Sequence, residues 1–440
     1  MDFTKIPALL KSRAKKTLPE AAAEPNPSEA KINPFLTRQD SLLLENLLRD
    51  VANGNVDGDD TGDKDDYALL QHLSDESSDR FEPQVFAGWD AKDLEKLPEP
   101  IKKYLLHPYV AWASGVVRRK TDIVFLTHIL IYLSTSVPSA VYLYRNFTWI
   151  HGVAHYLMQL FYCGAFTLML HNHIHNGGVL APSWAWLDHT FPYILEPLMG
   201  HTWDSYFYHH VKHHHVEGNG PDDLSSTIRY QRDEISHFLH YVGRFLFCVW
   251  LELPYYFIRK GRYGLGIRAF LSEVTSYAFV VGLWRWQWQP SLFVLALPLL
   301  TMRIGMMTGN WGQHAFVDEQ EPDSAFRSSI TLIDVPSNRY CFNDGYHTSH
   351  HLNPRRHWRD HPASLLKAKR QYAAGRALTF HNIDYLEITF RLLMKDYAHL
   401  AECLVPMGEQ IKMSKKELAD MLRTKTVAFT EEDIRKKFNL

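Results

Sequence analysis

The stretch "DIVFLTHILIYLSTSVPSAVYLY", residues 122–144, decides the fold class of this chain. After Asp122 it contains no charged side chain, and a helix of this length can cross the hydrocarbon core of a bilayer. Arg118, Arg119 and Lys120 come directly before it, and basic residues beside a span favour the cytosolic side. We therefore predict a transmembrane helix that begins at the cytosolic face.

Three further apolar runs complete two hairpins. The run at 149–170 follows after a short link, so the chain returns to the cytosolic side. The runs at 269–286 and 290–309 are also joined by a short loop. The sequence thus predicts an all-α integral membrane protein with four transmembrane helices in two hairpins.

The other segments predict interfacial and cytosolic structure. Residues 179–200 and 238–258 are apolar but interrupted by prolines or charges, which favours helices lying in the membrane interface. Residues 319–440 are polar and amphipathic, which favours a cytosolic helical cap. We expect a disordered polar N-terminal tail (1–95), a membrane domain (96–375) and a C-terminal cytosolic helical tail (376–440).

Charge and cysteine usage exclude several other classes. The formal net charge is −2, which gives no general basis for nucleic-acid binding. The four cysteines are scattered without a Cys-x-x-Cys pair, which argues against a disulfide scaffold and a zinc ribbon. This usage fits a reducing compartment.

Histidines recur at helical spacing near the predicted cytosolic ends of the hairpins. His171 and His175 are four residues apart, and Asn310 precedes His314 by the same interval. Two further groups follow an i, i+3, i+4 pattern: His210, His213 and His214, then His347, His350 and His351. Neutral imidazole is the commonest metal ligand in proteins, and nine such nitrogens exceed the needs of one ion. The pattern therefore predicts two metal ions.

The type of ligand favours iron over zinc. Zinc has no redox chemistry and its sites usually close with four ligands, whereas imidazole-rich sites also suit iron and copper. We expect carboxylates near the histidines to accept hydrogen bonds from the imidazole N–H groups and so fix the rings. The candidates are Glu217, Asp222, Asp223, Asp318 and Asp344.

Two assignments stay open at this point. His173 lies between His171 and His175 and ranks second as a ligand, because an i+2 position points away from their common face. The histidine-rich segment also allows a second register, His210, His214 and His215, in which His215 replaces His213.

The three histidine groups, in this order and at these spacings, resemble the boxes of the membrane-bound fatty acid desaturase family, over roughly residues 100–375. That family carries its boxes on a four-span membrane domain. The resemblance implies that Asn310 holds a ligand water and that nine histidines bind two iron ions. These are His171, His175, His210, His213, His214, His314, His347, His350 and His351.

The resemblance also implies an activity and its partners. Enzymes of this family use dioxygen to introduce a cis double bond into a long acyl chain of a lipid. They take electrons from a separate protein, a b-type cytochrome or a ferredoxin, and no fused haem motif is present here. The implied location is the endoplasmic reticulum membrane with the histidines facing the cytosol, or a plastid membrane. His347 stands where a Gln usually marks desaturation on the carboxyl side of an existing double bond, which disfavours that subtype.

Two other functions remain as alternatives. A lipid or alkane hydroxylase of the same superfamily would use the same histidines with a different outcome. A histidine-rich membrane metal transporter would place its ligands within the spans, whereas the groups here lie at the ends of the spans.

Overall fold

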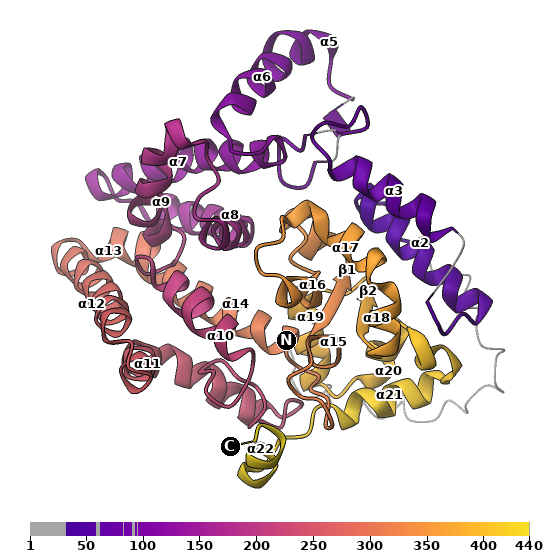
Figure 1. The fold of residues 1–440 in the computed structure, drawn as a ribbon. Coiled ribbons are helices and arrows are strands. Elements are labelled where there is room, and N and C mark those ends of the chain that lie inside the picture. The colour runs from indigo at the N-terminus through magenta and orange to yellow at the C-terminus, as the bar shows by residue number, and fades with distance from the viewer. Residues whose placement is uncertain (1–31, 59–61, 82, 90–92, 95, 440) are drawn as a thin grey trace, which may run out of the picture. The chain divides into compact units, whose positions relative to one another are not determined.

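The computed structural model describes residues 32–58, 62–81, 83–89, 93–94 and 96–439. These residues are mostly helical. They form an N-terminal helical hairpin, a membrane part and a C-terminal cap (Figure 1).

The N-terminal hairpin consists of α2 (Arg38–Asn53) and α3 (Asp63–Ser74). The leucines Leu43, Leu44 and Leu47 of α2 are buried in a core cluster that includes residues of the cap. The expectation of a disordered tail over residues 1–95 is therefore wrong for these two helices, because their apolar face finds a partner far away in the sequence. The part of that expectation that concerns residues 1–31 lies outside the described residues.

The membrane part contains the long helices. A short helical segment leads into it through α5 (Glu99–Ile101), η3 (Lys102–Leu106) and α6 (His107–Val116). The elements that follow are η4 (Lys120–Asp122), α7 (Ile123–Arg145), α8 (Trp149–Asn176), η5 (Pro182–Trp184), α9 (Ala185–Leu198), η6 (Phe207–His214), α10 (His215–Glu217), α11 (Ile235–Arg259), α12 (Tyr263–Trp286), α13 (Trp288–Ser291), η7 (Leu292–Ala296) and α14 (Leu297–Gln313).

Three helices among the described residues are long and apolar enough to cross a bilayer: Lys120–Arg145, Trp149–Asn176 and Trp288–Gln313. They include three of the four predicted spans. The fourth, 269–286, lies within α12, which has 24 residues but carries charged side chains. Four crossings therefore remain a prediction.

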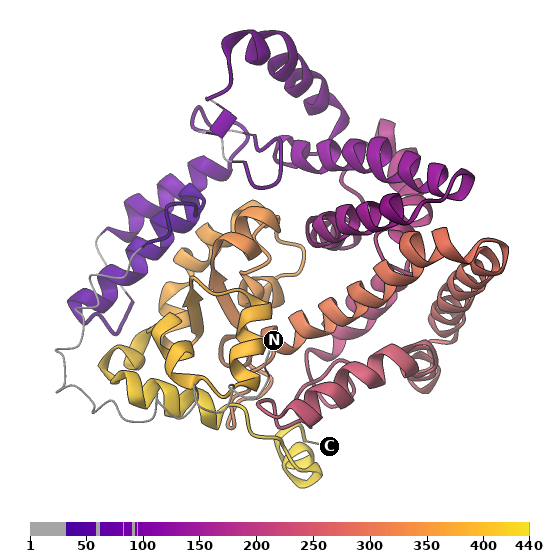
Figure 2. The ribbon, with the colours of Figure 1, turned by 180° about the vertical axis from the view of Figure 1, so that it is seen from behind.

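An ion pair explains how α12 accommodates the one buried acidic side chain among its charged residues, Glu273. Glu273 of α12 is 3% exposed and lies 2.7 Å from Arg303 of α14, which is also buried. A buried charge is costly unless a partner compensates it, and here each residue compensates the other. The pair links α12 to α14, and both helices are seen from behind in Figure 2.

The cap begins after α14 and is built from short elements. Its helices are α15 (Ala325–Ser328), η8 (Val335–Tyr340), α16 (His347–Leu352), η9 (Trp358–Asp360), α17 (His361–Lys367), α18 (Lys369–Ala374), α19 (Tyr385–Leu393), α20 (Tyr397–Cys403), η10 (Gly408–Lys412), α21 (Lys415–Thr424) and α22 (Glu431–Lys437).

A three-stranded sheet in the cap corrects the all-α expectation. Strand β1 (Ile330–Ile333) pairs in parallel with β2 (Leu378–His381), and β2 pairs in antiparallel fashion with β3 (Leu404–Val405). All four residues of β1 are buried, as expected of a short apolar strand that the cap covers on both faces. Such short segments carry little strand signal in the sequence, because their pairing partners are distant in the chain.

Candidate metal centre

Four separate elements bring histidines together between the membrane part and the cap. The last turns of α8 carry His171 and His175, and the segment η6–α10 carries a second group. His314 follows the C-terminus of α14, and α16 carries the third group. The histidines form two adjacent clusters.

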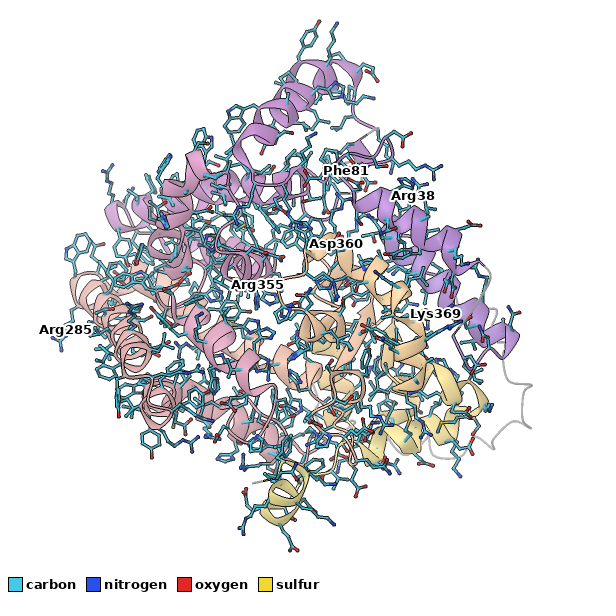
Figure 3. All side chains as sticks on the ribbon, viewed as in Figure 1. Arg38, Phe81, Arg285, Arg355, Asp360 and Lys369 are labelled. Carbon is cyan, nitrogen blue, oxygen red and sulfur yellow. The ribbon has the colours of Figure 1, made fainter. Side chains whose placement is uncertain are left out.

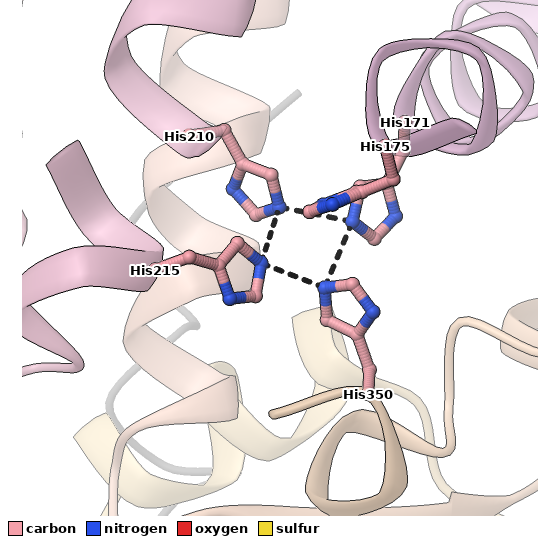
Figure 4. Close-up of side chains that lie close together, drawn as sticks. All are labelled: His171, His175, His210, His215 and His350. Carbon is pink, nitrogen blue, oxygen red and sulfur yellow. Dashed lines mark hydrogen bonds between the residues drawn. The ribbon is translucent and has the colours of Figure 1, made fainter. Parts of the chain in front are cut away.

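The first cluster contains His171, His175, His210, His215 and His350, whose ring nitrogens lie within 4.8 Å of one another. Four Nε2 atoms form a closed loop: the distances are 2.9 Å for His171–His210, 3.1 Å for His210–His215, 2.8 Å for His215–His350 and 3.1 Å for His350–His171 (Figure 4). The His175 ring centroid lies 4.8 Å from those of His171, His215 and His350.

Hydrogen bonds between the rings cannot account for all four contacts in this loop. In a neutral imidazole, Nε2 is either a hydrogen-bond donor or an acceptor. At most two of the four Nε2–Nε2 contacts in the loop can therefore be hydrogen bonds. Burial, with a contribution from neighbouring imidazoles, holds the pKa of His210 and of His350 well below the usual range, which keeps both rings neutral. His175 Nε2 is buried without a hydrogen-bond partner. Five neutral nitrogen lone pairs that converge in this way fit a divalent cation.

The second cluster contains His214, His314, His347 and His351. The Nε2 atom of His347 lies 3.2 Å from that of His314 and 3.0 Å from that of His351. Ring nitrogens of His214, His314 and His351 lie within 4.8 Å of one another. Burial lowers the pKa of His314 to about 3, so this ring is also neutral. The second cluster offers the same chemistry as the first.

Two carboxylates lie next to histidines of the clusters, and one of them forms a hydrogen bond. His214 Nδ1 lies 2.7 Å from Asp223 Oδ2, and donation to this carboxylate leaves the His214 Nε2 lone pair for a metal. Burial tends to raise the pKa of Asp223, but the interactions with His214, His213 and Ser225 together outweigh it and keep that pKa well below its usual range. Asp344 lies 3.7 Å from His171 Nδ1, and burial raises the pKa of Asp344 to about 7.

The other three predicted carboxylates contact cations instead. Glu217 and Asp222 pair with Lys260, and Asp318 pairs with Lys425. Among the five predicted carboxylates, Asp223 is therefore the one that forms the expected hydrogen bond to a histidine of the clusters, whereas Asp344 lies near His171 without such a bond.

A cavity of about 330 Å³ opens beside both clusters. His171 and His210 of the first cluster line it together with His214 and His347 of the second. The rest of its wall is largely apolar, and the residues include Leu168, Phe245, Met302, Met306 and Met307. A cavity with an apolar wall and imidazoles on one side accommodates an apolar chain next to the metal-binding groups.

A comparison with family models identifies this architecture. The fatty acid desaturase model matches residues 90–382, two thirds of the chain. The chain belongs to the fatty acid desaturase family. The comparisons with curated proteins and with solved structures found no match. The family match confirms the resemblance that the histidine boxes indicate. Membership of this family assigns the chain to the enzymes of oxygen-dependent lipid modification.

In the second histidine box of this desaturase-family chain, the clusters contain His210, His214 and His215 and not the predicted set His210, His213 and His214. His215 lies in the first cluster, whereas His213 lies in neither: its Nε2 accepts a hydrogen bond from the Leu224 amide at 3.2 Å. The reason is local, because η6 is a π-helix and the His215 amide bonds to the His210 carbonyl five residues earlier. In such a wide helix residues four and five apart share a face, so His210, His214 and His215 point together.

Two other predicted residues lie apart from the clusters. The His173 ring stacks on Phe191 and lies 3.4 Å from Asp188. This position agrees with its lower rank as a candidate metal ligand. Asn310 lines the cavity, and its side-chain amide donates to Ser225 O and to the Tyr241 hydroxyl. Its expected role in holding a ligand water stays a prediction.

Sequence spacing did not reveal several residues of the cavity wall. Gly305 and Gly309 are one turn apart on α14, and a Cβ at either would meet no atom within 4 Å. Tyr206 and Tyr385 also line the cavity. They carry no recognisable signal, because a cavity is formed by the way helices pack and not by a local pattern.

Proposed function

We propose that this protein is an oxygen-dependent desaturase that introduces a cis double bond into a long acyl chain of a lipid. In this proposal two iron ions are held by the two histidine clusters. The observation that carries the proposal is the convergence of nine imidazoles in two adjacent groups, each of which contributes two histidines to the wall of one apolar cavity.

The ligand set follows the geometry. One ion would be held by His171, His175, His210, His215 and His350, and the other by His214, His314, His347 and His351. Bound iron would supply the oxidising power that removal of hydrogen from an unactivated methylene requires, which no acid or base of the protein can supply. The remaining contributions come from the chain itself.

The cavity would select and orient the substrate. A methylene chain offers no polar group for recognition, so the wall can choose a carbon only by its shape and length. Met302, Met306 and Phe245 would hold the chain and exclude water, while the absence of side chains at Gly305 and Gly309 leaves room for it. Asp223 would keep His214 in orientation through its hydrogen bond to Nδ1.

The balance of the reaction requires a partner. Formation of a double bond with dioxygen yields two molecules of water, and this needs two electrons and two protons beyond the two hydrogens of the substrate. We propose that a separate small electron-transfer protein, a b-type cytochrome or a ferredoxin, supplies the electrons. The proposed location is the endoplasmic reticulum membrane with the clusters on the cytosolic side.

Expression in a yeast host tests the proposal. Cultures would be supplied with saturated and monounsaturated acids of several lengths, and the fatty acid methyl esters analysed by mass spectrometry. We expect a new unsaturated product with wild type and with His173→Ala, whose residue lies outside both clusters, and none with His350→Ala. A hydroxylated product in place of an unsaturated one would assign the protein as a hydroxylase.

Metal analysis of the purified protein gives an independent test. We expect about two iron ions per chain in wild type and fewer in His350→Ala. Purified protein that contains zinc alone, and that forms no product after loading with iron, would overturn the proposal.

A further inference from the structure

The N-terminal hairpin α2–α3 lies outside the residues that match the family model, yet it contacts the segment that carries the third histidine box. Asp40 of α2 is fully buried. Its Oδ1 accepts hydrogen bonds from the Tyr346 hydroxyl at 2.5 Å and from the Asn338 side-chain amide at 3.1 Å. Tyr346 is the residue directly before His347.

These contacts fix the turn that starts α16. Asn338 donates to the Leu332 carbonyl and accepts from the Gly345 amide at 3.1 Å, so Asp40, Asn338 and Gly345 form one hydrogen-bonded chain. Tyr346 is fully buried, and its ring lies parallel to that of His361. The backbone on the N-terminal side of His347 is therefore held by a carboxylate that lies about 300 positions earlier in the sequence.

A second group of contacts anchors the same hairpin to the cap. Lys369 of α18, labelled in Figure 3, is 1% exposed. Its ammonium lies 2.7 Å from both Asp50 and Asp63 and 2.9 Å from Asn46. A buried ammonium is stable only with such compensation, so its position ties α2 and α3 to the cap.

Helix α16 contributes histidines to both clusters. His350 belongs to the first cluster, while His347 and His351 belong to the second. A shift of this six-residue helix would move ligands of both sites at once. A helix so short has little stability of its own and depends on its surroundings.

We propose that the α2–α3 hairpin is a brace for α16, and that Asp40 is a positioning residue that holds His347, His350 and His351 in place through Tyr346 and Asn338. The proposal rests on the proposed function only in treating these histidines as metal ligands. The brace itself is a property of the metal-free chain.

Hydrogen–deuterium exchange of the metal-free protein over residues 345–353 tests the brace without any metal. Asp40→Leu keeps the size of the side chain but leaves the Tyr346 hydroxyl and the Asn338 amide without their acceptor. We expect the backbone amides of residues 345–353 to exchange at least about tenfold faster, since the loss of even one of these two buried hydrogen bonds has an effect of that size. Asp40→Asn retains an acceptor oxygen and is expected to restore slow exchange. Glu45→Gln, at an exposed position of the same helix, is the matched control.

Iron content per chain is the second measurement. We expect Asp40→Leu to bind less iron than wild type, and Asp40→Asn and Glu45→Gln to bind as much as wild type. Tyr346→Phe keeps the hydrogen bond between Asp40 and Asn338, so its iron content should lie between those of Asp40→Leu and wild type. Tyr346→Phe is the deciding variant if Asp40→Leu does not fold.

The two measurements separate the two proposals. Unchanged exchange and unchanged iron content in Asp40→Leu and Tyr346→Phe would overturn the brace, even in an active desaturase. Faster exchange in Asp40→Leu, in a protein whose wild type takes up no iron, would support the brace and overturn the proposed function.

Discussion

His215 and His350 lie 135 positions apart in the sequence, and their Nε2 atoms lie 2.8 Å apart in the fold. One belongs to the segment η6–α10 that follows the first hairpin, and the other to α16 of the cap. Their contact closes the loop of four nitrogens in the first cluster (Figure 4). The first cluster therefore depends on the cap as much as on the membrane part.

The register of the second box leads to the first prediction. We expect His215→Ala to reduce iron binding and product formation by more than about tenfold, because it removes a nitrogen from the first cluster. We expect His213→Ala to keep both close to the wild-type level, because His213 contacts the Leu224 amide and lies in neither cluster. Iron analysis and product profiling of the pair check this. The opposite result would restore the register with His213.

Cavity shape leads to the second prediction. Gly305→Leu places a side chain in the open space beside α14, so we expect the preference for long over short acyl substrates to fall by about tenfold or more. Competition between saturated acids of different length, followed by analysis of the methyl esters, measures this preference. Gly282→Leu on the exposed face of α12 is the control, and the idea fails if both variants keep the wild-type preference.

A buried arginine leads to the third prediction. Arg232 is fully buried, and its guanidinium donates to the Ala315 carbonyl beside His314 and to the carbonyls of Lys425 and Val427. We expect Arg232→Leu to lower the free energy of unfolding by about 3 kcal/mol, since several buried carbonyls lose their donor.

The control for Arg232 is a surface arginine of the same region. Arg229 forms a largely exposed pair with Glu431, so Arg229→Leu is expected to cost less than about 1 kcal/mol. Denaturant unfolding in detergent measures both variants. Equal losses would show that the Arg232 hydrogen bonds add little stability.

The carboxyl of Asp334 leads to the fourth prediction, which concerns pH. Burial raises the pKa of Asp334 to about 8, and its Oδ2 has no hydrogen-bond partner. The folded state then holds this proton between about pH 4 and pH 8, whereas the unfolded state has released it. The contribution of Asp334 to stability therefore falls as the pH rises through this window.

The substitution Asp334→Asn removes that titration. We expect the thermal midpoint of the variant to fall less than that of wild type between pH 5 and pH 8. Asp323→Asn, at an exposed position of the cap, should behave as wild type does. A parallel loss in all three proteins would assign the pH dependence to other groups.

The family and most of the metal-binding candidates were predictable from the sequence. His171 and His175 lie on one face of α8, and His347, His350 and His351 lie on α16, because ordinary helical spacing determines which side chains point together. The same rule failed for the second box, since it assumes an α-helix and η6 is a π-helix.

The N-terminal hairpin shows the other limit of the sequence. Residues 1–95 are polar overall, and nothing local indicates that Asp40 and Asp50 are buried. Their partners, Tyr346 and Lys369, lie about 300 positions away. Composition predicts disorder where a segment has no partner, and it carries no information about a partner supplied by a distant part of the chain.

By itself the sequence determined the long apolar helices, the identity of most of the clustered histidines and the membership of the desaturase family, because these depend on hydrophobicity and on spacing along one helix. Only the tertiary structure decided that His215 joins the first cluster in place of His213, that one cavity borders both clusters, and that the N-terminal hairpin packs against the cap and contacts Tyr346 directly before α16. The physical reason is that burial, cavities and hydrogen bonds between distant residues arise only when separate helices pack.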